Sequence, residues 1–227
     1  MLEDINLLKT IYFIINNNNI KNYKEITDLN LFNKSLSGKI LNIDLKEIIE
    51  LEGLEKLTLN HFTITDETLD ILNKLEKLYK IEFYFCEFKT NKTLEHKMQE
   101  VMFYSCKTAP INILNNITNI EKLTIINSGF INISDLQTFI NLKYLKINKC
   151  EILSLPMIEK LINLEKLYLN NIQLEYEFNI TNMTNLGFIS FNGSKHYDKQ
   201  SYINNLKKQN VDLLIEWEED DFPKEYL

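Results

Sequence analysis

The stretch LKYLKINKCEILSLPMIEKLINLEKLYLN, residues 142–170, contains one apolar pattern twice. Its first copy is Leu142, Leu145 and Ile147, and its second copy is Leu164, Leu167 and Leu169. The step from each position of the first copy to its counterpart in the second is 22 in the numbering. Short apolar alternation of this kind predicts a strand, because alternate side chains of a strand point to opposite faces.

The same pattern continues on both sides of this stretch. The copies with the central residue at intervals of 22 are Ile120-Leu123-Ile125, Leu142-Leu145-Ile147, Leu164-Leu167-Leu169 and Leu186-Ile189-Phe191. A fixed period of this length indicates a solenoid, in which each unit buries its apolar face against its neighbours. The pattern resembles the leucine-rich repeat family, in particular the short 22-residue subclass of phosphatase-regulatory subunits and bacterial internalins. The resemblance implies an α/β fold, a curved right-handed βα solenoid of about nine coils with a concave parallel sheet.

Towards the N-terminus the repeats lose their regular length. The copies there are Leu54-Leu57-Leu59, Leu78-Ile81-Phe83 and Met98-Val101-Phe103, whose central residues give intervals of 24, 20 and 22 into the regular part. We expect an earlier copy at Ile26-Leu29-Leu31, with an interval of 28 from Leu29 to Leu57 and a helix at 44–51 in the extra length. The alternative start, Ile40-Ile43-Leu45, leaves an interval of 14 between Ile43 and Leu57, which is too short for one coil.

Both ends of the chain are expected to close the solenoid. Residues 1–25 carry apolar side chains at helical spacing and predict an N-terminal helical cap. Residues 26–197 hold the repeats, and residues 198–227 predict a C-terminal cap: a helix over 198–208, a last strand over 211–217 and an acidic tail. The tail, Glu216 and residues 218–221, is expected to keep the last strand from pairing with other chains.

A membrane-associated alternative is weaker. The longest apolar run near the N-terminus is Ile11–Ile15, far short of the ~20 residues that a membrane span requires. Glu3 and Asp4 occupy the place where a signal peptide carries positive charge. We therefore expect a cytoplasmic, monomeric protein.

The composition indicates a soluble single domain, argues against nucleic-acid binding and is compatible with a basic protein partner. The net charge is −7 and the isoelectric point is near 5.2, whereas a phosphate-backbone binder needs clustered Lys and Arg. No linker rich in Pro, Gly or Ser interrupts the repeats. No cofactor is expected, because the sequence has no Gly-rich phosphate loop and only five glycines.

The three cysteines are explained by their position in the repeat. The ninth position of each unit reads Phe62, Cys86, Cys106, Ser128, Cys150, Ile172 and Ser194, and it includes every cysteine of the chain. The family resemblance implies that this side chain lies inside the coil and bonds the backbone of neighbouring turns, with interruptions at Phe62 and Ile172. We expect free, buried and unreactive thiols.

Catalysis has little support in the sequence. A Cys106–His96 nucleophile pair would need an accessible thiolate beside its base, but Cys106 points into the coil in this register. A metal site built from His61, Cys86 and Cys106 is weaker still. We therefore predict a protein that is not an enzyme and holds no metal.

Function is expected on the concave sheet, where the side chains between the leucine positions face outward. Tyr84, Tyr104 and Ile126 follow consecutive strands, with Met102 and Phe85 beside them, and predict one apolar, aromatic patch. A second group is Tyr144, Tyr168 and Phe188, bordered by Lys143, Lys146 and Lys166. The predicted partner-binding residues are Tyr84, Phe85, Met102, Tyr104, Ile126, Tyr144, Lys146 and Tyr168. The alternative is that Tyr and Ile occur there because they are good strand formers.

The leading hypothesis is a non-enzymatic module that binds a protein on its concave face, with a regulatory role implied by the subclass resemblance. One alternative is an inhibitor or immunity-type protein for a basic partner, which the negative net charge favours and the mixture of Lys and Glu in the outward positions disfavours. The other is an enzyme or small-ligand-binding protein, which requires a pocket with converging polar groups.

Overall fold

The computed structural model describes residues 23–33, 43, 45–95, 98–107, 111–131, 136, 138–152, 155–174 and 177–218. The predicted cap at 1–25 lies outside these residues, apart from the short 3₁₀ helix η1 at Tyr23–Glu25, as do residues 219–221 of the acidic tail. The chain divides into two compact units, residues 1–120 and 121–227, which are described one at a time.

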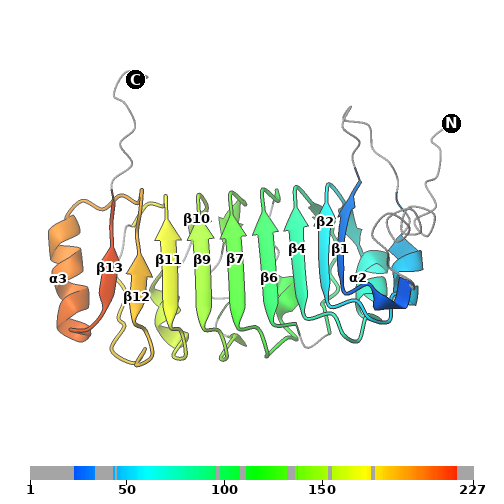
Figure 1. Cartoon of the computed structure of the whole chain (residues 1–227). Coiled ribbons are helices and arrows are strands. Elements are labelled where there is room, and N and C mark those ends of the chain that lie inside the picture. The colour runs from blue at the N-terminus through cyan, green and yellow to red at the C-terminus, as the bar shows by residue number, and fades with distance from the viewer. Residues whose placement is uncertain are drawn as a thin grey trace, which may run out of the picture. The chain divides into compact units, whose positions relative to one another are not determined.

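The described part of the first unit is built on four parallel strands (Figure 1). They are β1 (Asp28–Phe32), β2 (Lys56–Asn60), β4 (Lys80–Tyr84) and β6 (Glu100–Tyr104). In the register of this sheet Leu29 lies opposite Leu57, Leu57 opposite Ile81, and Ile81 opposite Val101. The first copy of the pattern is therefore Ile26-Leu29-Leu31, as the sequence predicted.

The described part of the second unit is built on five parallel strands. They are β7 (Lys122–Ile126), β9 (Tyr144–Asn148), β11 (Lys166–Asn170), β12 (Phe188–Ser190) and β13 (Leu214–Glu216). Leu123 lies opposite Leu145, Leu145 opposite Leu167, and Leu167 opposite Ile189. The period of 22 thus sets the register, because one coil brings the chain back to the same position on the next strand.

In both units the strand side chains alternate between the coil interior and the opposite face, which we call the outer sheet face. In β2, β4, β6 and β9 the second and fourth residues are buried and the other three are half-buried. The apolar pattern supplies the buried positions, including Leu57, Phe83 and Leu145, each at most 1% exposed. The side chains available to a partner on the sheet are therefore the residues between the leucine positions.

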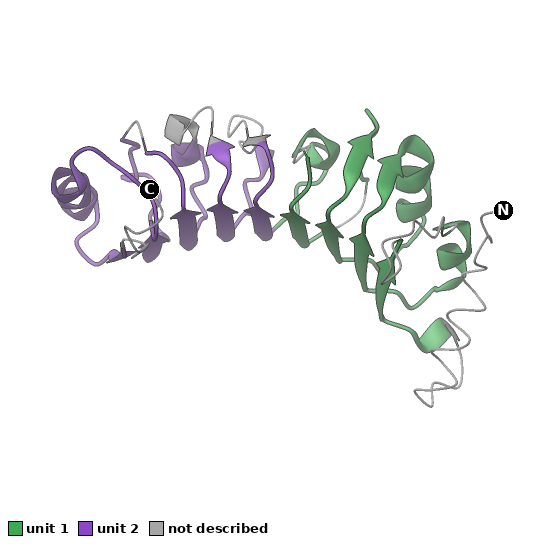
Figure 2. Cartoon of the chain, turned by 90° about the horizontal axis from the view of Figure 1, so that it is seen from above, with its two compact units in different colours: residues 1–120 green, residues 121–227 purple. Residues whose placement is uncertain are grey.

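The return segments lie on the other side of the strands (Figure 2). In unit 1 they contain the 3₁₀ helices η2 (Leu45–Glu50) and η3 (Ile111–Leu114), the helix α2 (Asp66–Leu72), and the paired strands β3 (Thr63–Thr65) and β5 (Glu87–Lys89). In unit 2 they contain the paired strands β8 (Phe130–Ile131) and β10 (Glu151–Ile152) and the 3₁₀ helix η5 (Leu155–Lys160). The helix expected at 44–51 is the 3₁₀ helix η2.

A left-handed residue directly follows β2, β4, β6, β7, β9 and β11, and Gly193 takes the same conformation after β12. In the described part of the chain these residues, with φ between 50° and 69°, are His61, Phe85, Ser105, Asn127, Lys149, Asn171 and Gly193. Side chains other than Gly, Asn and Asp rarely adopt this conformation, which costs roughly 1–2 kcal/mol per residue. The repeat therefore imposes a sharp turn at this position even where the sequence offers no glycine.

The ninth-position column forms a ladder of hydrogen bonds inside each unit. The Cys86 thiol donates to the Leu59 carbonyl over 3.3 Å, and in unit 2 the Cys150 sulfur accepts from the Ser128 backbone N–H over 3.5 Å. In unit 2 the Ser194 hydroxyl donates to the Leu169 carbonyl over 2.7 Å and accepts from the Ile172 N–H over 3.0 Å. Phe62 and Ile172 contribute no polar side chain, as expected, yet the backbone N–H of Ile172 is bonded by Ser194, the next residue of the column.

In the described part of the C-terminal cap, lysines of the cap helix cover the outer edge of the last strand, while the role of the acidic tail stays a prediction. The helix α3 spans Lys199–Gln209, and β13 covers only Leu214–Glu216 because residues 211–212 form a turn. Leu214 N–H and the Glu216 carbonyl bond the neighbouring chain segment at β12, so the Leu213 and Trp217 carbonyls point to the opposite edge. Two lysines of α3 bond them: Lys207 donates to Leu213, and Lys199 donates to Trp217 over 2.9 Å.

Candidate functional site

An aromatic cluster lies on the outer sheet face of unit 1. Four of the predicted site residues meet there, and we call them the unit 1 patch: Tyr84, Phe85, Met102 and Tyr104. The Tyr84 and Tyr104 ring centroids are 5.4 Å apart, and the Phe85 ring stands edge-on to Tyr104 at 5.7 Å. The Tyr84 hydroxyl oxygen lies 3.7 Å from the Met102 sulfur. The strand register places Tyr84 opposite Tyr104, so neighbouring strands bring these rings together.

A group of charges borders the patch on the same strands. Lys80 pairs with Glu82 at 3.0 Å and with Glu100 at 3.7 Å, and the Tyr84 hydroxyl donates to Glu82 over 3.2 Å. The hydrogen bond that Lys80 donates to Glu82 raises the pKa of Lys80. Partial burial, and then the Glu82 charge, raise the pKa of Tyr84. The tyrosine hydroxyl and the lysine ammonium therefore keep their protons at neutral pH, and the patch presents fixed donors beside an apolar surface.

Phe85 is the least expected member of the patch. It follows β4 in the left-handed conformation, with φ of 52°, and its side chain is 47% exposed. A bulky residue in that conformation is a backbone outlier, and outliers of this kind gather at functional sites. The His61 ring stacks on Phe85 at 4.9 Å. His61 is not among the residues that the sequence predicted for this patch, although it holds the position equivalent to Phe85 in the preceding repeat.

Ile126 belongs to a different compact unit from the four residues of the unit 1 patch. It is the last residue of β7 and belongs to unit 2, where it is half-buried. Its membership of one continuous patch with Tyr104 stays a prediction.

A second aromatic cluster lies on the outer sheet face of unit 2. We call it the unit 2 row: Tyr144, Tyr168 and Phe188. Ring centroids are 5.1 Å apart both between Tyr144 and Tyr168 and between Tyr168 and Phe188. The Lys122 ammonium lies 5.4 Å from the Tyr144 ring centroid, and the Lys146 ammonium lies 5.9 Å from that of Tyr168. Burial raises the pKa of Tyr144, so its hydroxyl remains protonated at neutral pH.

A shallow pocket adjoins the unit 2 row. It has a volume of about 710 Å³, and its lining includes Tyr168, Gly187, Phe188 and the exposed Leu214. Its signal in the sequence is Gly187, which replaces a longer side chain at one repeat position. The repeat pattern is defined by the leucine positions, so it does not predict a pocket at this glycine.

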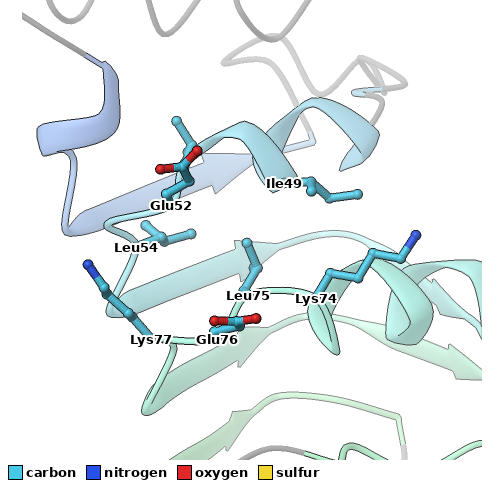
Figure 3. Close-up of a pocket in the computed structure, with 8 residues that line it drawn as sticks. Ile49, Glu52, Leu54, Lys74, Leu75, Glu76 and Lys77 are labelled. Atoms are coloured by element: carbon cyan, nitrogen blue, oxygen red, sulfur yellow. The ribbon is translucent and has the colours of Figure 1, made fainter.

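Unit 1 has a smaller pocket away from its patch. It has a volume of about 360 Å³ and lies between η2 and the turn that follows α2 (Figure 3). Buried Leu54 and Leu75 form part of the wall, and Figure 3 shows the Lys74 amino group pointing away from Glu52 and Glu76. Glu52 is held by Lys24 at 2.7 Å. These polar groups do not converge on a common point, which a small-molecule site requires.

The cysteines are free and buried, as the sequence predicted. Burial raises the pKa of Cys86 to about 12 and that of Cys106 to about 11, and it also raises the pKa of Cys150. The thiolate is the reactive form, so these groups are poor nucleophiles at neutral pH. His96 lies outside the described residues. Within the described ranges, no three His, Cys, Asp or Glu side chains come together as metal ligands.

None of the helices among the described residues has the length and apolar content that a membrane crossing requires.

Comparisons with known proteins agree with this geometry. No protein-family model matches the sequence, and no curated protein matches it. Among solved structures, internalin C2 from Listeria monocytogenes matches with a TM-score of 0.59 and 20% identity over 86% of this chain and 82% of that chain. A leucine-rich-repeat protein from Leptospira interrogans matches with a TM-score of 0.57 and 21% identity over 87% of this chain and 50% of its own length. The chain thus has the leucine-rich-repeat fold, with repeats like those of internalin C2.

Proposed function

We propose that this chain is a non-enzymatic protein-binding module, and that the unit 1 patch is the centre of its contact with a partner. The single observation that supports it most is Phe85, a large aromatic side chain held half-exposed in a strained backbone conformation. Asn127, Asn171 and Gly193 hold the equivalent position in other repeats and tolerate this conformation better than the bulky Phe85 does.

The composition of the patch supports the same role. Tyrosine and other aromatic side chains dominate the centres of protein interfaces because they bury large area with few rotatable bonds. The rim of an interface is polar, and here Lys80, Glu82 and Glu100 provide such a rim. Met102 adds an adaptable apolar side chain beside the Tyr84 hydroxyl.

We extend the proposed contact to the other predicted residues of the outer sheet face, Ile126, Tyr144, Lys146 and Tyr168. A regulatory role and a cytoplasmic location belong to the same proposal. Binding, not chemistry, would carry the regulation, since the described cysteines hold their protons at neutral pH.

The double variant Tyr84→Glu/Tyr104→Glu is expected to lose the partner. Two carboxylates introduced among the aromatic rings would be desolvated on binding without a partner for their charge. The measurement is affinity capture from a lysate of the native organism, with quantitative mass spectrometry of the retained proteins. Circular dichroism melts establish that the variant remains folded.

The matched control is Tyr197→Glu, because Tyr197 is 87% exposed and lies at the C-terminal end of the repeats. A protein retained by the wild type and by this control, and lost from the double variant, would support the proposal. Equal retention by all three chains would refute it, as would the absence of any specifically retained protein.

Phe85→Asn separates binding from folding. Asparagine tolerates the left-handed conformation, so we expect the melting temperature to stay the same or to rise. Partner binding is expected to fall by tenfold or more, because an aromatic residue at an interface centre contributes at least ~1.4 kcal/mol. Isothermal titration with the captured partner measures the second effect. A clear drop in the melting temperature together with unchanged binding would show that Phe85 serves the fold.

A further inference from the structure

We propose that unit 2 carries a pocket for an arginine side chain, formed over Gly187 between Phe188 and the carboxylates of Glu165 and Glu216. The inference rests on the proposed function, because the arginine would belong to a protein partner. It adds a second contact on the other unit and names the chemistry of the partner there.

The pocket exists because one repeat position has lost its side chain. The residue after the first leucine position reads Glu55, Tyr79, Gln99, Glu121, Lys143, Glu165 and Gly187. A Cβ added at Gly187 would meet nothing within 4 Å, so the position opens directly into the pocket of about 710 Å³. Its backbone is held on both sides, since Gly187 N–H bonds the Glu165 carbonyl at 3.1 Å and its carbonyl accepts from Leu214 at 3.0 Å. The pocket is thus a hollow in a fixed sheet.

The apolar part of the lining combines a half-buried aromatic ring with an exposed leucine. Phe188 is half-buried, its ring centroid lies 5.1 Å from that of Tyr168, and the two rings are tilted by 44°. Lys146 already lies over Tyr168, so Phe188 is the ring that can accept a second cation. Leu214 lies opposite Phe188 on β13 and is 65% exposed. The lining therefore offers an aromatic face for a planar group and an apolar side chain for an aliphatic stem.

The charges of the lining favour a cation. Glu165 and Glu216 both line the pocket, and among the described residues neither side chain has a basic partner. Lys166 is the one basic residue of the lining, so the lining carries an excess of one negative charge. An anionic group would meet two carboxylates there, and a purely apolar side chain would bury Phe188 while leaving both carboxylates without a partner.

Arginine fits these features better than lysine. The guanidinium is planar, stacks on aromatic rings and donates bidentately to carboxylates, whereas the lysine ammonium is compact and strongly hydrated. The methylene stem of arginine covers apolar surface such as Leu214. The chain as a whole carries a net charge of −7, which attracts a basic partner at long range.

The test uses N-acetyl-arginine N-methylamide as the probe, with ¹H–¹⁵N NMR of the full chain. We expect saturable shifts at the amides of Gly187, Phe188 and Leu214. The citrulline analogue has the same shape without the charge, and we expect it to bind about tenfold more weakly, because charge-assisted hydrogen bonds are roughly twice as strong as neutral ones. Equal shifts from both probes, or no shift at these amides, would overturn the proposal.

Two variants locate the site. Gly187→Gln supplies the neutral side chain that Gln99 has at the same position of another repeat, and its Cβ enters the pocket without a clash. Glu216→Gln removes one carboxylate, while its backbone bond to Phe191 stays in place. Each is expected to weaken the probe at least tenfold, since each removes a charge-assisted contact or the space for the ligand. Glu151→Gln, an exposed residue of β10, is the matched control and should bind as the wild type does.

The variant Tyr84→Glu/Tyr104→Glu separates this proposal from the proposed function. These residues belong to unit 1, so the probe should bind this variant with unchanged affinity. Probe binding without any partner capture would refute the proposed function and leave the guanidinium site. Partner capture that is lost in the tyrosine variant, with no probe binding, would refute the pocket alone.

Discussion

Leu145→Ala is expected to lower the free energy of unfolding by about 2–5 kcal/mol, the range for a buried leucine that leaves a cavity. Leu145 is 0% exposed in β9 and lies between Leu123 and Leu167 of the neighbouring strands. The loss therefore affects three consecutive coils, and in a repeat array stability depends on such nearest-neighbour contacts. Urea denaturation followed by circular dichroism measures it.

The control for this change is Ile140→Ala. Ile140 belongs to the same unit and is 55% exposed, so its truncation should change stability by no more than about 0.5 kcal/mol. Similar losses in the two variants would mean that the burial pattern of this coil is wrong.

Ser194→Ala is expected to cost at least about 2 kcal/mol for a different reason, because each unsatisfied buried polar group costs about 1–3 kcal/mol. The Ser194 hydroxyl bonds two buried backbone groups, the Leu169 carbonyl and the Ile172 N–H, and each would lose its partner. The measurement is again urea denaturation, together with hydrogen exchange of the Ile172 amide, which should become faster.

Ser194→Cys provides the comparison, because cysteine fills the same column at positions 86, 106 and 150 and donates to a carbonyl of the preceding coil there. Its cost should be clearly smaller than that of Ser194→Ala. If alanine and cysteine destabilise the protein equally, the hydrogen bonds contribute little and the volume of the side chain decides the effect.

The strand register was predictable because it follows from the number of residues between equivalent positions of successive repeats. Leu145 and Leu167 lie opposite each other after one period of the repeat, and the structure confirms this pairing. The irregular returns were less predictable. The longer interval between Leu57 and Ile81 contains the helix α2, whose capping box at Thr65 and Thr68 is local chemistry that the leucine pattern does not reveal.

The contact between Tyr84 and Tyr104 was also predictable, because both follow the same position of adjacent repeats. Their role in binding stays a prediction. The pocket at Gly187 and the strain at Phe85 were not found from the sequence. The pocket depends on a side chain that Gly187 lacks, and the left-handed φ of Phe85 depends on the turn that the coil imposes. Neither feature changes the periodic spacing of apolar residues in the sequence.

The lysines of α3 have a consequence for assembly. The last strand of a stack of coils is an edge strand, and its unbonded backbone carbonyls can pair with a strand of another chain. Lys199 and Lys207 donate hydrogen bonds to two of these carbonyls, so the carbonyls are not available to a further strand. Further repeats could thus be grafted onto this end only after α3 is removed. Sequence added after residue 218 would leave both lysines of α3 in place.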